Sequence, residues 1–139
     1  MKTKVFNSIT PLAVVFVLFL TSCKKYPDGP AISLRSRAER VSNAWKVESV
    51  TLNGNDITSS FTSINYTENY DKDGNYSYSS SIGNGSGKWA FENNDEQIKR
   101  SGVSGQSSIS MTILRLKENS FWYEFKDGSD NFHFHLIPK

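Results

Sequence analysis

The stretch "SISMTILRLKENSFWYEF" (residues 108–125) decides the fold. Apolar and polar side chains alternate along both of its halves, which is the pattern of a β-strand with one buried face. The inward-facing residues expected from this alternation are Ile109, Met111, Ile113, Phe121, Tyr123 and Phe125. The triplet "KEN" (117–119) between the halves has turn chemistry. The stretch therefore predicts a β-hairpin with strands near 107–117 and 120–126.

The same pattern repeats across the rest of the chain from residue 44 onward. Short runs rich in Val, Ile, Thr, Tyr, Phe and Trp alternate with Gly and Asn clusters such as "DKDGN" (71–75) and "IGNGSG" (82–87). Short connections of this kind join antiparallel neighbours. We therefore predict an all-β fold, an eight-stranded antiparallel up-and-down barrel with strands near 44–52, 62–70, 75–82, 86–92, 96–101, 107–117, 120–126 and 131–137.

Two of these strands change the phase of their apolar residues. In the first strand Trp45 and Val47 would point to one face of a regularly alternating strand, whereas Val50 would point to the opposite face. A similar change follows Ile113, where Leu114 is the next apolar residue. Both changes predict β-bulges, which bend strands as a small closed barrel requires. Before the first strand, residues 33–43 predict a short helix with Ser33 or Ser36 as its cap, and Trp45 is predicted to plug the closed end of the barrel.

The N-terminus has the features of a targeting signal. Lys2 and Lys4 precede a nearly continuous apolar run over residues 9–20. This run is shorter than the roughly 20 apolar residues of a comfortable transmembrane helix. Residues 1–22 are therefore predicted to be a signal peptide.

The sequence Leu20-Thr21-Ser22-Cys23 at the end of this run resembles the bacterial lipobox. The resemblance implies that Cys23 becomes the mature N-terminus and carries fatty acyl chains such as palmitate. Several acyl chains hold a protein firmly at a membrane, whereas one chain binds only marginally. An ordinary secretory signal with an incidental cysteine is the alternative interpretation.

The mature chain that these predictions define has a balanced charge. Without Lys2 and Lys4 it holds 14 basic and 14 acidic side chains, and Cys23 is its one cysteine. Neither a nucleic-acid partner nor an internal disulfide is therefore expected. Residues 23–35 are predicted to form a tether and residues 36–139 the barrel domain. Lys25 and Tyr26, where surface-displayed lipoproteins have an acidic patch, favour the periplasmic side of the outer membrane.

Four segments together resemble the lipocalin-like lipoproteins of Bacteroidetes-type bacteria. They are "NAWKVESVTLNG" (43–54), "YDKDGNYSYS" (70–79), "GSGKWAFENNDEQI" (85–98) and the 108–125 hairpin. The resemblance covers roughly residues 40–138 and implies an eight-stranded up-and-down barrel. Asn43 stands where lipocalins proper have the glycine of their G-x-W motif. The family has no agreed ligand, so the resemblance implies no binding residues.

Two groups of side chains are candidate sites. Tyr76, Tyr78, Phe121 and Tyr123 are predicted to line the mouth of the barrel and to contact a small apolar or amphipathic ligand. His133 and His135 share one face of the last strand, and the hairpin brings Glu124 beside one of them on the outer surface. Two histidines and a carboxylate are a weak candidate for a metal site. A solvated outer face with a Glu–His pair is the favoured interpretation.

Two functions follow from these features. The first is a membrane-anchored envelope lipoprotein that binds a small apolar or amphipathic ligand inside its barrel. The alternative is a filled barrel that acts as a protein-interaction or inhibitor module through outer residues Trp122, His133, His135 and Ile137. We predict no enzymatic activity and no cofactor, because no set of acid, base and nucleophile converges in the sequence. An empty interior would favour the first function, and a packed interior the second.

Overall fold

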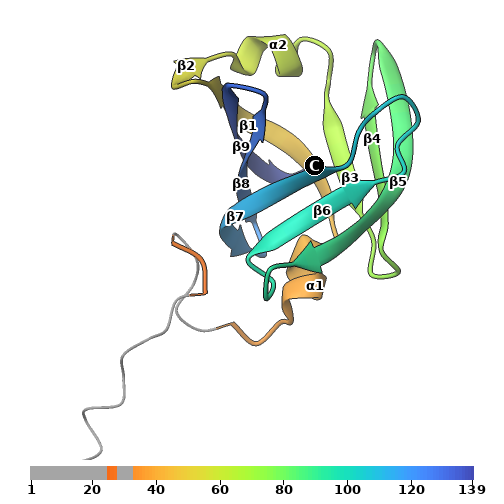
Figure 1. The fold of residues 1–139 in the computed structure, drawn as a ribbon, viewed down its shortest axis with the longest axis vertical. Coiled ribbons are helices and arrows are strands. Elements are labelled where there is room, and N and C mark those ends of the chain that lie inside the picture. The colour runs from red at the N-terminus through yellow and green to blue at the C-terminus, as the bar shows by residue number, and fades with distance from the viewer. Residues whose placement is uncertain (1–24, 28–32) are drawn as a thin grey trace, which may run out of the picture.

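The computed structural model describes residues 25–27 and 33–139, which form a closed antiparallel β-barrel with two short helices (Figure 1). The predicted signal peptide (1–22), Cys23 and part of the predicted tether lie outside the described residues. The elements are α1 (Arg37–Val41), β1 (Ala44–Leu52), β2 (Asn55–Asp56), α2 (Thr58–Thr62), β3 (Thr67–Tyr70), β4 (Asn75–Ser80), β5 (Gly83–Glu92), β6 (Gln97–Ser101), β7 (Ile109–Lys117), β8 (Ser120–Asp127) and β9 (Asp130–Pro138).

The barrel is closed by pairing between its first and last strands. Strands β1 and β3 to β9 follow one another around the sheet in chain order, and every pair is antiparallel. Strand β9 then pairs with β1 from Trp45↔Pro138 to Leu52↔Phe132. The two-residue β2 pairs only with the end of β1. The predicted all-β, eight-stranded up-and-down barrel with lipocalin-like architecture is therefore confirmed.

The connection between β1 and β3 differs from the prediction. Residues 62–66 were expected to be extended, but Thr62 ends α2 and β3 begins only at Thr67. The side chain of Asp56 accepts a hydrogen bond from the Thr58 amide at 2.8 Å, which supports the start of the helix. Asn65, with φ 54°, then turns the chain into β3. Isolated five-residue helices are too short to show a helical apolar period, so α2 had no clear signal.

The glycine-rich segment "IGNGSG" also differs from the prediction of a turn. The turn is confined to Ser81 and Ile82, and Gly83 already belongs to β5. A Cβ on Gly85 would lie 2.5 Å from Cε1 of Tyr78, and a Cβ on Gly87 would collide with the carbonyl oxygen of Ser101. These glycines therefore make room for neighbouring strands and side chains inside the barrel.

Both predicted bulges are present. The pairing of β1 with β9 shifts register between Val47 and Ser49, and the pairing of β7 with β8 shifts between Ile113 and Arg115. Each shift restores the apolar residues on both sides of it to the inner face, so that Val50 and Leu116 are both fully buried.

The two helices cover opposite ends of the barrel (Figure 1). Ser36 and Glu39 form a capping box that begins α1, which confirms the predicted cap. Trp45 is fully buried at this end, where its indole donates to the Val41 carbonyl at 2.9 Å. At the other end Phe61 of α2 packs edge-on against Phe134 and Tyr66, with centroid distances of 5.1 and 5.5 Å. Trp45 therefore plugs one end as predicted, and α2 covers the other.

Candidate functional site

A buried carboxylate lies at the centre of the barrel. Glu68 follows the same phase as Tyr70 on β3, so its side chain points inward, and the residue is 1% exposed. Its Oε1 accepts hydrogen bonds from the hydroxyls of Tyr66 at 2.9 Å and Tyr123 at 2.8 Å. Its Oε2 accepts one from the Tyr70 hydroxyl at 2.9 Å. Three phenols thus replace the water that this carboxylate loses on folding.

The charge of this carboxylate is balanced by a buried arginine from the opposite wall. Arg100 shares its phase on β6 with Ile98, and its Nη1 lies 2.8 Å from Oε1 of Glu68. The same nitrogen donates to the Tyr76 hydroxyl at 2.8 Å. Its guanidinium carbon lies 4.8 Å from the centre of the Tyr76 ring and 5.6 Å from that of Tyr123. We call Glu68, Arg100 and the tyrosines 66, 70, 76 and 123 the inner cluster.

The phenols and the arginine of the inner cluster have raised pKa values. Burial, and then the charge of Glu68, raise the pKa of the phenols of Tyr66, Tyr70, Tyr76 and Tyr123 above the usual value. Burial alone would lower the pKa of Arg100, but the surrounding phenols and Glu68 raise it well above its usual value. At neutral pH the four phenols are therefore neutral and Arg100 is charged. Both carboxylate oxygens of Glu68 and the Nη1 of Arg100 are bonded to other groups of the cluster.

Three of the four predicted ligand-contacting residues lie in this packed interior. Tyr76, Phe121 and Tyr123 are 3%, 0% and 0% exposed. Phe121 packs against Trp45, Tyr70 and Tyr123 at centroid distances of 5.7, 5.7 and 5.2 Å. The structure therefore brings these residues together, in contact with other side chains of the barrel.

The fourth predicted residue, Tyr78, lies nearer the surface. It is half-buried, its ring stacks on Tyr66 at 6.0 Å, and its hydroxyl accepts a hydrogen bond from the Gln106 side chain at 3.3 Å. The ring also fills the space beside Gly85. Tyr78 thus joins the inner cluster to the outside of the barrel.

Two hollows of the described surface open outward. One of 290 Å³ lies between β1 and β3 and includes Lys46, Tyr66 and Lys139 in its lining. Another of 600 Å³ lies over β4 and β5, with Ser77, Ser86 and Lys88 in its lining. Both are bordered by exposed residues. The space that the strands enclose is occupied by the apolar core and the inner cluster.

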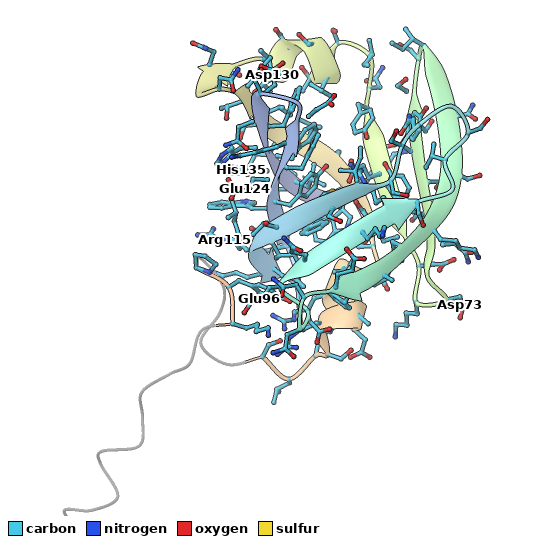
Figure 2. The ribbon with its side chains drawn as sticks, viewed as in Figure 1. Asp73, Glu96, Arg115, Glu124, Asp130 and His135 are labelled. Atoms are coloured by element: carbon cyan, nitrogen blue, oxygen red, sulfur yellow. The ribbon has the colours of Figure 1, made fainter. Side chains whose placement is uncertain are left out.

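An ordered stack of side chains covers the outer face of β7, β8 and β9. The strand register places Arg115 beside Trp122 and Trp122 beside His135. The Arg115 guanidinium carbon lies 3.5 Å from the centre of the Trp122 ring, and the His135 ring stacks at 3.9 Å with an angle of 12°. Figure 2 shows Arg115 and His135 on the same side of the barrel. We call these three residues the outer ladder.

The predicted Glu–His pair forms beside this ladder. Glu124 is paired with His133 across the hairpin, and its Oε2 lies 3.0 Å from His133 Nε2. The Asn131 side chain lies 3.0 Å from the same ring nitrogen. His135 instead stacks on Trp122, so the three candidate metal ligands do not converge. Within residues 25–27 and 33–139, no group of three or more His, Cys, Asp or Glu side chains could hold a metal ion.

Sequence reasoning did not identify the two charged residues of the inner cluster. The alternation of inward and outward residues along each strand nevertheless indicates that both side chains point inward. Glu68 lies two residues before the buried Tyr70, and Arg100 lies two residues after the buried Ile98. A charged residue in phase with inward apolar residues indicates a buried ion pair when a partner of opposite charge has the same phase.

Comparisons with known proteins add no family assignment. A scan against protein-family models finds no match, and a search of curated proteins finds no significantly similar sequence. The class that the structure defines is therefore the lipocalin-like, eight-stranded β-barrel. In the described part of the chain, neither helix has the length and apolar character needed to cross a bilayer.

Proposed function

We propose that this chain is a lipid-anchored lipoprotein of a bacterial outer membrane whose filled barrel acts as a protein-interaction module on the periplasmic side. It is neither an enzyme nor a carrier of a small ligand in its interior. The observation that carries the proposal is the inner cluster, which fills the centre of the barrel with groups that satisfy one another.

The inner cluster argues against an interior ligand on energetic grounds. A ligand at Tyr76 or Tyr123 would have to displace side chains that are bonded to Glu68 or Arg100. Each buried donor or acceptor that such a displacement leaves without a partner costs about 1–3 kcal/mol. Both ends of the barrel are also covered, by Trp45 with α1 and by Phe61 of α2. Binding at the outer surface requires no such disruption.

The outer ladder supports the choice of surface. Tryptophan and arginine are enriched among the residues that dominate protein interfaces. Here Trp122 is held between Arg115 and His135, so its position is fixed before a partner arrives. Such preorganisation lowers the entropy cost of binding.

The location of the protein is supported by its sequence. The predicted signal peptide and the lipobox-like Leu20–Cys23 segment support export and acylation of Cys23. Lys25 and Tyr26, in place of an acidic patch, support the periplasmic orientation. The partner is therefore expected to be another protein of the cell envelope.

A paired cross-linking experiment tests the proposal. A photoreactive amino acid replaces Lys126, which lies on the same outer face of β8 as Trp122, or, as the matched control, Ser86 on the outer face of β5. Both positions are exposed. In the living host we expect one discrete cross-linked protein at position 126 and none at position 86. Trp122→Ala should weaken the cross-link at position 126 while circular dichroism shows an intact barrel.

Native mass spectrometry of the mature protein from its own host tests the carrier alternative. We expect the mass of the acylated chain without a further bound molecule. A small molecule retained in stoichiometric amount would overturn the proposal, and so would equal cross-linking at both positions.

A further inference from the structure

Tyr26 is buried although it lies within the segment predicted to be a tether. The residue is 2% exposed and belongs to the same core cluster as the residues of the barrel. Its hydroxyl donates a hydrogen bond to the carbonyl oxygen of Asp95 at 2.9 Å. The neighbouring Lys25 lies 3.9 Å from Glu96. The chain is therefore attached to the barrel at residue 26, far ahead of α1.

The attachment lies at the end of the barrel that α1 covers. Asp95 belongs to the β5–β6 turn, and Arg37 of α1 bonds its carboxylate at 2.5 Å. Lys72 in the β3–β4 turn bonds Glu39 of α1 at 3.4 Å. Figure 2 shows Asp73 and Glu96 at this same end. We call α1, residues 33–36 and these turns the α1 end.

Sequence distance then limits how far the predicted lipid anchor can be from this end. Cys23 precedes Tyr26 by three residues, and an extended chain spans at most about 3.6 Å per residue. The acylated sulfur can therefore lie no further than roughly 11 Å along the backbone from residue 26, plus the length of its own side chain. A tether of 13 residues would allow free rotation of the barrel, whereas three residues do not.

An exposed apolar side chain lies at the same end. Leu34 is fully exposed just before α1, and it is followed by Arg35, which pairs with Glu118 at 3.1 Å. The other exposed large apolar residue in the described chain is Ile82, in the β4–β5 turn at the opposite end. An exposed leucine beside paired charges suits the interface of a bilayer, where apolar side chains insert between headgroups.

From these observations we propose that the α1 end is the membrane-facing surface of the barrel: Tyr26 fixes the anchored chain there, so that this end lies against a phospholipid bilayer with Leu34 inserted. The inference rests on the proposed lipid anchor at Cys23. It places the β4–β5 turn and α2 on the side that faces away from the membrane.

Fluorescence quenching on the full acylated protein in phosphatidylethanolamine–phosphatidylglycerol vesicles tests this orientation. Because the chain has one cysteine and acylation blocks it, Leu34→Cys and Ile82→Cys each provide one reactive thiol for an environment-sensitive dye. We expect the dye at position 34 to shift to the blue and to be quenched by spin-labelled lipid. The dye at position 82, the matched control, should remain in water and be quenched only by a soluble quencher.

Variants of Tyr26 test its role in the orientation. Tyr26→Ala should make lipid quenching at positions 34 and 82 similar, whereas Tyr26→Phe, which keeps the ring and loses the bond to Asp95, should retain most of the difference. If Tyr26→Ala does not fold, the comparison of the two positions in the otherwise unchanged chain still decides the question.

Intact mass separates this inference from the proposed function. A mature chain without acyl mass on Cys23 would overturn both. An acylated chain with equal lipid quenching at positions 34 and 82 would overturn the orientation alone. Shielding of position 34 without vesicles, growing with protein concentration, would show self-association through Leu34 and would also overturn it.

Discussion

Two arginines of this barrel lie over aromatic rings, one inside the barrel and one outside. Arg100 is 8% exposed, bonds Glu68 and lies over the rings of Tyr76 and Tyr123. Arg115 is half-exposed and lies over Trp122. The chemistry is similar, but the first arginine is surrounded by protein and the second keeps access to water. Burial, rather than the kind of contact, therefore determines how much each cluster contributes to stability.

The inner cluster is consequently important for stability and the outer ladder is available for recognition. Inside, every displaced bond leaves a group without water, which costs far more than the bond itself contributes. Outside, water replaces a lost contact at little cost.

Alkaline pH should have the largest effect, because it acts on the whole inner cluster. Unfolded phenols titrate near pH 10, whereas Tyr66, Tyr70 and Tyr123 in the fold have a raised pKa. Above pH 10 the unfolded chain therefore binds fewer protons than the folded one, so the free energy of unfolding falls as pH rises. Burial also raises the pKa of Tyr26 to about 12.

Absorbance at the phenolate band and near-ultraviolet circular dichroism, followed together, measure this effect. We expect the buried phenols to titrate only as the tertiary signal is lost. Titration of Tyr66, Tyr70 and Tyr123 near pH 10 in a barrel that keeps its tertiary signal would contradict the prediction.

Arg100→Met should be the most damaging single substitution of the set. It leaves the Glu68 carboxylate buried without its counter-charge, which costs about 3–5 kcal/mol. The double variant Glu68→Gln/Arg100→Met removes the charge and keeps an acceptor for the phenols, so it should be more stable than Arg100→Met. Urea unfolding of the variants measures both. A double variant no more stable than the single one would show that the charge is not the cause.

Gly87→Ala tests how completely the interior is filled. The new Cβ would collide with the Ser101 carbonyl oxygen and lie 2.9 Å from Cγ2 of Val103. Overpacking of this kind costs about 1–3 kcal/mol. Gly83→Ala is the matched control on the same strand, since nothing lies within 4 Å of its Cβ position. Thermal unfolding should show a clear loss of stability for Gly87→Ala alone. Equal losses for Gly87→Ala and Gly83→Ala would contradict a filled interior.

Arg115→Ala should have the smallest effect. A cation–π contact at an exposed site contributes about 0.5–1 kcal/mol. Arg115→Lys keeps the charge but loses the flat stacking of the guanidinium, so it should recover only part of this loss. Chemical unfolding of both variants and of Arg100→Met measures the loss in the free energy of unfolding at the outer and the inner arginine. A cost for Arg115→Ala equal to that of Arg100→Met would remove the distinction between the two clusters.

The sequence predicted the barrel because its signals are local. Alternation and turn residues gave the 108–125 hairpin, and the phase changes at Val47 and Ile113 gave both bulges. Helix α2 was missed because a five-residue helix has too few residues to show a period. The glycines of β5 were mistaken for a turn, because the ring of Tyr78 that requires Gly85 is supplied by another strand.

The side-chain contacts of the candidate sites were likewise predictable where they lie within one hairpin, and not where they join distant strands. The pairing of Glu124 with His133 follows from one hairpin and was predicted. The bond between Glu68 and Arg100 joins β3 to β6, strands that are not neighbours in the sheet, so the sequence alone could not bring them together. Tyr26 was assigned to a tether because nearby prolines and glycine predict no regular structure, but burial of one ring does not require a helix or a strand.

The pairing of β1 with β9 has a consequence for the kinetics of folding. Most pairings around the ring join segments linked by a short turn, whereas Trp45 pairs with Pro138 across nearly the whole domain. Contacts between such distant segments form slowly, because a long loop must close first. Until then a newly made chain is an open sheet with two unpaired edges, which are templates for aggregation. The speed of this one closure therefore sets how long each new molecule is at risk.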